Sequence, residues 1–276
     1  MVRPAPGGIA WQIAGERVEL LSWPRAILLQ LAHPLVAAGV GGHSRFRGSP
    51  LAPYGRLHAT VTAMRALTFG SDEEAEAARA AILQVHDRVH GTLSAAVGAH
   101  AAGTPYTAHD PALLLWVHAT LVDSGVRVMH DVVRPLTRAE RDAYCDETAS
   151  LAEALGARSM DVPRDWAALQ QYIDAEIASG RVSVGEQARV LGSAVLRPAL
   201  GWLAWPLQRA VEIVTIGWLP DTIRTQYGFT WDAARERRMR RVLAILRRAR
   251  RWMPDALARW PEARAERTNG ALPPGP

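Results

Sequence analysis

The chain has 276 residues, of which 49% are hydrophobic and 21% are charged, with 22 Gly, 18 Pro and one Cys. A chain of this length and composition can bury a sizeable core, which excludes a disordered, collagenous or disulfide-stapled protein. The lone Cys145 has no partner for an intramolecular disulfide and cannot build a multi-cysteine zinc site. We therefore expect a globular protein of a reducing compartment.

All 32 basic residues are arginine, which excludes Schiff-base chemistry and any lysine ligand. The formal net charge of +5 is concentrated between Trp231 and Arg251, where nine arginines stand against Asp232 and Glu236. This pattern predicts the solvated face of an amphipathic helix whose apolar side carries residues such as Met239. We expect no nucleic-acid partner, and a peripheral membrane contact through this Arg-rich C-terminal helix stays open as an alternative.

The sequence carries only weak targeting and membrane signals. Residues 1–8 are polar and rich in Pro and Gly, without the roughly 7–15-residue apolar run of a signal peptide. Residues 26–40 are apolar, but Gln30, His33 and Pro34 interrupt them, and they fall short of the roughly 20 residues that a spanning helix needs. These features predict a cytoplasmic protein.

Apolar residues recur at three- and four-residue spacing through most of the chain, and the alternating runs that are typical of strands are nearly absent. The sequence therefore predicts an all-α protein. The expected helices, in chain order, cover residues 9–21, 24–40, 54–68, 72–97, 111–130, 137–155, 163–179, 184–198, 202–217, 219–226, 231–251 and 254–267.

Three of these helices have explicit start signals. Ser71 precedes three acidic residues, which predicts an N-cap with a capping box. Asp110 before Pro111 predicts an N-cap followed by the first helical residue, and Asp161 with Pro163 predicts the same for a later helix.

No internal repeat or linker divides the chain, so we expect one domain over residues 1–276. Within it we expect a core over about 10–200, a helical, Arg-rich C-terminal extension over about 201–267 and a disordered tail over 268–276. Turn-rich segments at 40–53 and 98–110 are expected to join helices, and loops of this kind often border sites.

The nine histidines are the main candidates for chemistry. His86 and His90 stand four apart on one expected helix and would share a face. The zinc-peptidase motif needs Glu after the first His, where this chain has Asp87, and no Glu has a His three residues later as di-iron bundles require. One helical His also suits the proximal position of a b-type haem, since no motif for covalent haem attachment occurs. On spacing alone, a partly buried histidine with a structural role remains the better interpretation of any one of them.

Short motifs follow one another in a specific order along the first two thirds of the chain. They are QLAHPLVAAGV at 30–40, HSRF at 43–46, GRLHAT at 55–60, FG at 69–70, VHDRVHG at 85–91, YTAHDP at 106–111 and LWVHATLVDS at 115–124. This succession resembles the MpaB-like family, which contains the rubber oxygenase (latex-clearing protein) catalytic domain and an endoplasmic-reticulum-bound oxygenase of mycophenolic acid biosynthesis. The resemblance covers roughly residues 10–200.

The resemblance implies a globin-like, all-α core that holds one b-type haem and cleaves carbon–carbon double bonds of isoprenoid chains with O2. His86 matches the family's proximal-ligand motif and is expected to bind the iron, with His90 as the alternative ligand. Arg56 and Thr60 match the Arg-x-x-x-Thr pair that lines the distal pocket of rubber oxygenases. Those enzymes have Lys directly before the Thr, whereas this chain has Ala59. The distal position is therefore expected to be open or water-filled, or to be approached by another residue such as His118.

Each matched residue has a chemical role under this resemblance. Arg56 would stabilise negative charge on bound oxygen or pair with a haem propionate, and Thr60 would donate a hydrogen bond to the distal ligand or cap its own helix. His118 is either a distal acid/base or a core histidine bonded to Asp123 or Ser124.

His33 and His43 belong to the family pattern, but the sequence alone gives them no role.

Taken together, these residues predict a haem-b-dependent oxygenase, an oxidoreductase that acts with O2 on an apolar, isoprenoid or otherwise unsaturated small molecule. The sequence leaves two alternatives open. One is a non-catalytic haem or gas-binding protein, and the other is a haem-free helical binding protein that contacts a membrane or a partner.

Overall fold

Helices make up most of the described part of the chain, which confirms the expected all-α class. The computed structural model describes residues 4–43, 52–197 and 205–264, without the side chains of His43 and residues 52–58. The α-helices are α1 (Ile9–Gly15), α2 (Ser22–Ala32), α3 (Pro34–His43), α4 (Ala52–Phe69), α5 (Asp72–His86), α6 (Pro111–Val128), α7 (Arg138–Leu155), α8 (Trp166–Ala178), α9 (Glu186–Leu196), α10 (Trp205–Gly217), α11 (Asp221–Gln226), α12 (Ala233–Trp252) and α13 (Asp255–Ala258). They are joined by the 3-10 helices η1 (Arg17–Leu21) and η3 (Ser159–Asp161), the π-helical turn η2 (Met129–Val133) and the strands β1 (His90–Thr92) and β2 (Pro105–Thr107).

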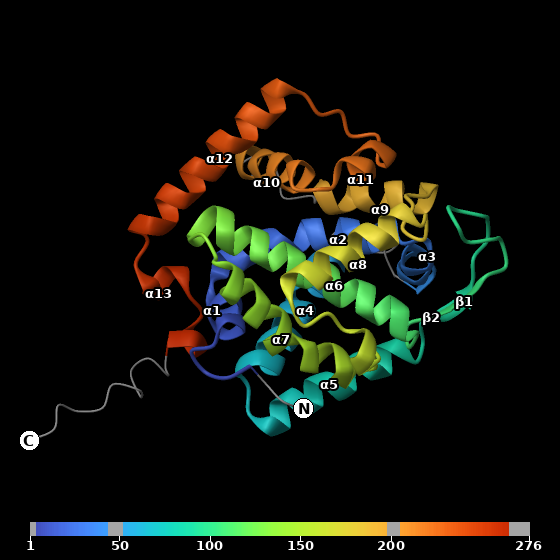
Figure 1. The fold of residues 1–276 in the computed structure, drawn as a ribbon, viewed down its shortest axis with the longest axis horizontal. Coiled ribbons are helices and arrows are strands. Elements are labelled where there is room, and N and C mark those ends of the chain that lie inside the picture. The colour runs from blue at the N-terminus through green and yellow to red at the C-terminus, as the bar shows by residue number, and fades with distance from the viewer. Residues whose placement is uncertain (1–3, 44–51, 198–204, 265–276) are drawn as a thin grey trace, which may run out of the picture.

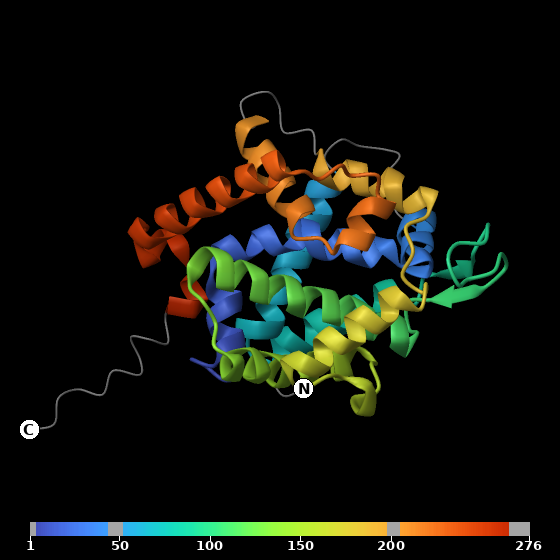
Figure 2. The same ribbon diagram turned by 45° about the horizontal axis from the view of Figure 1, so that its top comes forward.

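Helices α2 and α6 pack against each other through the middle of the fold (Figures 1 and 2). Helices α7 and α8 cover α6 on one side, and α9 and α10 cover α2 on the other. Trp116 of α6 is 1% exposed and donates a hydrogen bond from its indole nitrogen to the carbonyl of Leu29 in α2, at 3.1 Å. Because a buried indole needs such an acceptor, this bond fixes how the two central helices meet.

A buried ion pair joins the same two helices. Arg25 of α2 contacts Asp123 of α6 with 2.5 Å between Nη2 and Oδ2, and both side chains are almost fully buried. Arg25 also donates to Ser124 Oγ at 2.7 Å and to the carbonyl of Trp218 at 2.8 Å, while Gln170 of α8 donates to Asp123 at 3.0 Å. Burial is the largest single influence on the pKa of Asp123 and would raise it, but the charges of Arg25 and Arg127 and the hydrogen bonds from Gln170 and Arg25 together hold that pKa below its usual value. The pair is therefore ionised and fully hydrogen-bonded inside the core.

Two of the three expected start signals are confirmed. Ser71 accepts a hydrogen bond from the backbone N–H of Glu74, whose carboxylate accepts one from the backbone N–H of Ser71, which is the expected capping box. Asp110 accepts from the N–H of Ala112 at 2.9 Å and caps α6. The third is wrong, because α8 begins at Trp166 and its N-cap is Asp165.

The expected helix over 24–40 is wrong as a single element, because the chain leaves the helical conformation at His33. This residue has φ −81° and ψ 118°, since proline at the next position disfavours helical geometry in the residue before it. The buried His33 side chain then accepts a hydrogen bond from the N–H of Leu35, at 3.3 Å, in the first turn of α3. His33 thus has a structural role at the break between α2 and α3.

The expected helix over 72–97 ends eleven residues early, at His86. The following residues form an antiparallel hairpin in which His90, Gly91 and Thr92 pair with Thr107, Tyr106 and Pro105, in that order. Glycine is a poor helix former, and the pairing partner lies some fifteen residues further along, so helical periodicity alone misses this hairpin. The hairpin projects from the helical body in Figure 1.

Within the residues that the structure describes, one helical stretch, Pro111–Val133, is long and apolar enough to cross a membrane by length and composition. Its most apolar window is 78% buried inside the fold. The core helix of a protein that does not cross a membrane would be buried in the same way. The stretch is therefore weak support for a membrane span. The expected tail over 268–276 and the turn-rich residues 44–51 lie outside the described part of the chain.

Replacing Arg25 by Leu is expected to lower the free energy of unfolding by about 3–5 kcal/mol, because it leaves the Asp123 carboxylate buried without its cation. Urea denaturation at pH 7 measures the loss. The double variant Arg25→Leu, Asp123→Leu should lose less than the sum of the two single variants, since it removes both charges together. Additive losses would show that the two side chains do not interact in the folded protein.

Candidate functional site

His86 is the last residue of α5, and its imidazole has an unsatisfied nitrogen. The side chain is partly buried, and its Nδ1 atom is buried without a hydrogen-bond partner. Burial, followed by the neighbouring His109, lowers the pKa of His86 below its usual value. The ring is therefore neutral near pH 7 and has a nitrogen with no hydrogen-bond partner in the described part of the chain, which is the state in which imidazole binds a metal.

His109 lies edge-on to His86, with 5.8 Å between the ring centroids. Its Nε2 atom is 2.8 Å from Oδ1 of Asp87, the residue that follows His86. A single helix over 72–97, as the sequence pattern predicts, would keep these two histidines apart. The hairpin of β1 and β2 returns the chain to the end of α5, and recognising two short antiparallel strands would have revealed the pair.

The motif residue Val89 contacts the motif residue Gly39 on α3. A Cβ atom added at Gly39 would lie 3.0 Å from Cγ1 of Val89 and 3.7 Å from the ring of Tyr106. Glycine at this position therefore lets α3 approach the hairpin closely. Three widely separated motifs of the sequence thus meet beside His86.

Arg56 and Thr60 lie one turn apart on α4, so they share a face of that helix. Helix α4 packs against α5, which brings this helix next to the one that carries His86. The Arg56 side chain is outside the described part, and Thr60, like the preceding Ala59, is exposed. The structure therefore places α4 against α5, while the position of the Arg56 guanidinium lies outside its described part.

His118 is buried in α6, with 8% of its surface exposed. Burial lowers its pKa to about 4, so the imidazole is neutral. Within the described residues, no hydrogen bond joins His118 to Asp123 or Ser124, as one of its two expected roles required, and both of those side chains bind Arg25. Among the described residues, His118 makes no ring contact or hydrogen bond with His86.

His90 is exposed on β1, so the two histidines expected on one helix face belong to different elements. Its position differs from that of His86, whose ring is partly buried against His109. The geometry thus favours His86 over His90 as a ligand, since a partly buried, neutral imidazole has less competition from water. The His43 side chain is outside the described part.

Comparison with known proteins gives the family. The chain matches the family described as "ER-bound oxygenase mpaB/B'/Rubber oxygenase, catalytic domain" over residues 11–248. It is 28% identical over 234 residues to uncharacterized protein Mb2261 of Mycobacterium bovis and, to the same extent, to uncharacterized protein Rv2237 of Mycobacterium tuberculosis. Each alignment covers 83% of this chain and 87% of the relative. No solved structure matches the chain.

The family match spans most of the chain and includes every motif beside His86, on α4 and on α6. The two mycobacterial relatives align with this chain over 87% of their own length. The chain therefore belongs to the mpaB and rubber oxygenase catalytic-domain family, a family of oxygenases.

Proposed function

We propose that this protein is a haem-b-dependent oxygenase that acts with O2 on an apolar, isoprenoid or otherwise unsaturated small molecule. The observation that carries the proposal is the buried, unpartnered Nδ1 atom of His86, at the end of a helix that packs against the helix of Arg56 and Thr60. A buried polar atom without a partner is costly unless a ligand satisfies it. Membership of an oxygenase family supports the same reading.

The residues beside His86 fit a haem ligand. One neutral imidazole suffices to hold a b-type haem, and the lowered pKa of His86 keeps its lone pair available. The adjacent Val85 is 57% exposed, which presents an apolar surface of the kind that a porphyrin covers. When bound, the haem would supply the iron that activates O2. We also propose that α4, α5 and α6 contribute to a globin-like haem core.

The other residues of the site would bind polar groups or hold neighbouring side chains in position. The Asp87 carboxylate fixes His109, whose ring edge in turn limits the rotation of the His86 ring. Arg56 would neutralise an anionic group through its forked donors, and Thr60 would donate a hydrogen bond from its hydroxyl. His118, buried and neutral, would accept a proton at a ring nitrogen if substrate reaches α6.

The ligand assignment predicts a selective loss of haem. Protein expressed with added haem precursor is expected to show a strong Soret band that shifts when the reduced protein binds CO. His86→Ala should lose most of the haem, because the only proposed iron ligand is gone, whereas the matched variant His90→Ala should keep it. Absorption spectra and haem content per protein measure both.

The opposite pattern, with haem lost only in His90→Ala, would show that His90 is the ligand. Wild-type protein that neither copurifies with haem nor takes up haemin would overturn the proposal and favour a haem-free binding protein. Haem-loaded protein that consumes no O2 with isoprenoid probes such as squalene would favour a haem or gas-binding protein without catalysis.

The burial of His118 predicts a pH-dependent stability. Its pKa is about 4 in the folded protein and about 6.5 when unfolded, so the unfolded chain binds more protons between these values. Stability therefore falls as the pH drops from about 6.5 towards 4. His118→Phe should reduce this slope by about 1.4 kcal/mol per pH unit, as measured by urea denaturation from pH 8 to 4.5. An unchanged slope would place His118 in contact with water.

We propose as a second feature that the outer face of α12 contacts anionic membranes peripherally. The apolar side of α12 packs on the core through Met239, with Val242, Leu243 and Leu246 against the same cluster, so most of its arginines are exposed, while Arg250 turns inward to pair with Glu16. At the end of this helix Trp252 is 76% exposed, and Leu257 of α13 is 62% exposed. Arginines flanking exposed aromatic and aliphatic groups suit the surface of an anionic bilayer.

Vesicle binding tests this surface. The protein is expected to sediment with vesicles that contain about 30% phosphatidylserine and not with pure phosphatidylcholine, and rising salt should release it, because electrostatic attraction is screened. Trp252→Ala should weaken the binding, while Met160→Ala, which removes an exposed apolar residue far from α12 in the sequence, should not. Equal binding to both kinds of vesicle would contradict an electrostatic contact.

A further inference from the structure

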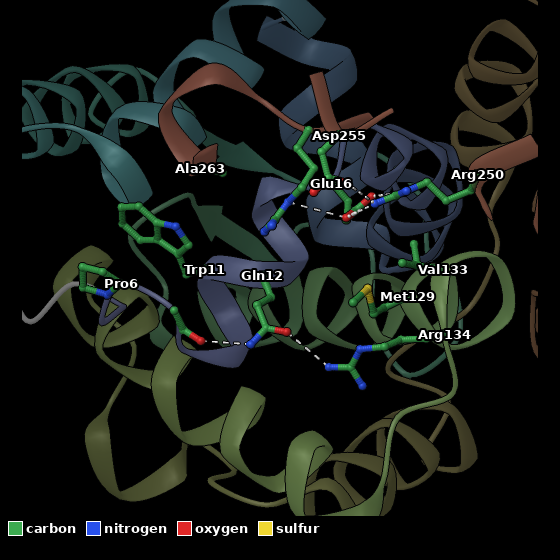
Figure 3. A pocket seen from close by; sticks show the side chains of 12 residues that line it. Pro6, Trp11, Gln12, Glu16, Met129, Val133, Arg134, Arg250, Asp255 and Ala263 are labelled. Atoms are coloured by element: carbon green, nitrogen blue, oxygen red, sulfur yellow. Dashed lines mark hydrogen bonds and ion pairs between the residues drawn. The ribbon is translucent and has the colours of Figure 1, made fainter. Parts of the chain in front are cut away.

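A cavity of about 670 Å³ lies beside α1, away from the residues proposed to hold haem. Figure 3 shows that Trp11 and Gln12 of α1, Met129 and Val133 of η2, and residues of the C-terminal segment converge on it. Its volume is in the range of small-molecule sites. None of His86, Thr60 and His118 lines it.

Most charged groups at this cavity have protein partners. Arg250 forms a two-point pair with Glu16, with distances of 2.6 Å from Nε to Oε2 and 2.8 Å from Nη2 to Oε1 (Figure 3). Arg250 also lies 3.5 Å from Asp255. Arg134 pairs with Glu140 at 2.7 Å and donates to Gln12 at 3.2 Å. These cations are therefore neutralised without a ligand.

Arg259 differs from these residues, because its ion pair with Glu16 includes no hydrogen bond. It is 8% exposed, and its side chain makes one polar contact among the described residues, with 3.6 Å between Nε and Oε1 of Glu16. That distance is too long for a hydrogen bond, and the buried Nε atom has no hydrogen-bond partner. A guanidinium has five N–H donors, so a buried arginine with none of them bonded leaves strong donors for an anionic ligand.

The backbone holds Arg259 at the cavity. Arg259 forms an antiparallel bridge with Glu16, and the N–H of Trp260 donates to the carbonyl of Gly15 at 3.0 Å. A Cβ atom added at Gly15 would lie 3.1 Å from Nη2 of Arg259 and 2.8 Å from Cβ of Ala263, so glycine is needed for this close approach. The guanidinium is thus positioned before any ligand arrives.

One part of the cavity wall is apolar. Trp11 is 6% exposed and Met129 is 4% exposed, and Val133 and Ala263 complete this side. The π-helical turn supplies two of these residues, and such turns frequently occur at functional sites. The cavity therefore joins one unsatisfied planar cation to an apolar surface.

We propose that this cavity binds a small amphiphilic monocarboxylate. Its carboxylate accepts hydrogen bonds from the fork of Arg259, and its hydrocarbon part lies against Trp11, Met129 and Val133. A planar carboxylate matches the guanidinium fork, whereas a phosphate dianion would bring a second negative charge towards Glu16 and Asp255. This site is independent of the proposed haem, since the two share no residue.

Octanoate is the probe for the test, and the full-length protein is titrated by calorimetry. Wild-type protein is expected to bind octanoate, with 1-octanol, octylamine and inorganic phosphate each at least tenfold weaker. Arg259→Gln should weaken octanoate binding at least tenfold, and Arg259→Lys should weaken it too, because lysine keeps the charge without the fork. The control Arg138→Gln, at an arginine whose side chain is 81% exposed on α7, should bind like wild type.

Octanol or phosphate that binds as tightly as octanoate would overturn the proposal, as would Arg259 variants with wild-type affinity. If the Arg259 variants do not fold, as judged by circular dichroism, Val133→Trp replaces them. Val133 is partly exposed, and tryptophan there should fill the cavity and abolish octanoate binding. Unchanged binding by that variant would place the octanoate elsewhere and overturn the proposal.

Discussion

The buried pair of Arg25 and Asp123 is the interaction on which the arrangement of the helices depends. It joins α2 to α6, reaches the end of α10 through the carbonyl of Trp218, and reaches α8 through Gln170. Two charges in a core are tolerated only when their hydrogen-bonding groups are satisfied together, so these four elements can pack in few other ways. Helix α6 in turn carries His118, and α2 leads directly into α3, so the pair fixes the framework around the candidate site.

The site beside His86 depends on two interruptions of helical structure. Pro34 ends α2, and the new direction of α3 brings Gly39 against Val89. The hairpin after α5 then returns the chain so that His109 meets His86 and Asp87. Because glycine contributes no side chain at Gly39, α3 and the hairpin approach each other closely. Three of the motifs, at 30–40, 85–91 and 106–111, thus meet in space.

Each of the two proposed ligand sites has a nitrogen atom without a hydrogen-bond partner among the described residues. The side chains that carry these atoms differ in charge and therefore in the kind of ligand that they would bind. The His86 imidazole is neutral, and its open nitrogen suits a metal. The Arg259 guanidinium is a permanent cation and suits an oxyanion. Burial has opposite consequences for the two groups. It favours the neutral form of a histidine, whereas an arginine stays charged and is costly to bury without an anionic partner. Cys145, by contrast, is buried with its pKa raised to about 12, which leaves its thiol protonated and unreactive.

The sequence by itself determined the features that arise within a few residues of one another. Helical periodicity predicted the all-α class, Ser71 and Asp110 marked the starts of α5 and α6, and the ordered motifs identified the family and singled out His86. Tertiary structure alone decided which distant groups meet. Examples are Arg25 with Asp123, which are 98 positions apart, the strands that replace the expected end of α5, and Arg259 beside Gly15. Caps and periodicity act within one or two turns, whereas these pairings depend on the packing of the whole chain, which no local pattern encodes.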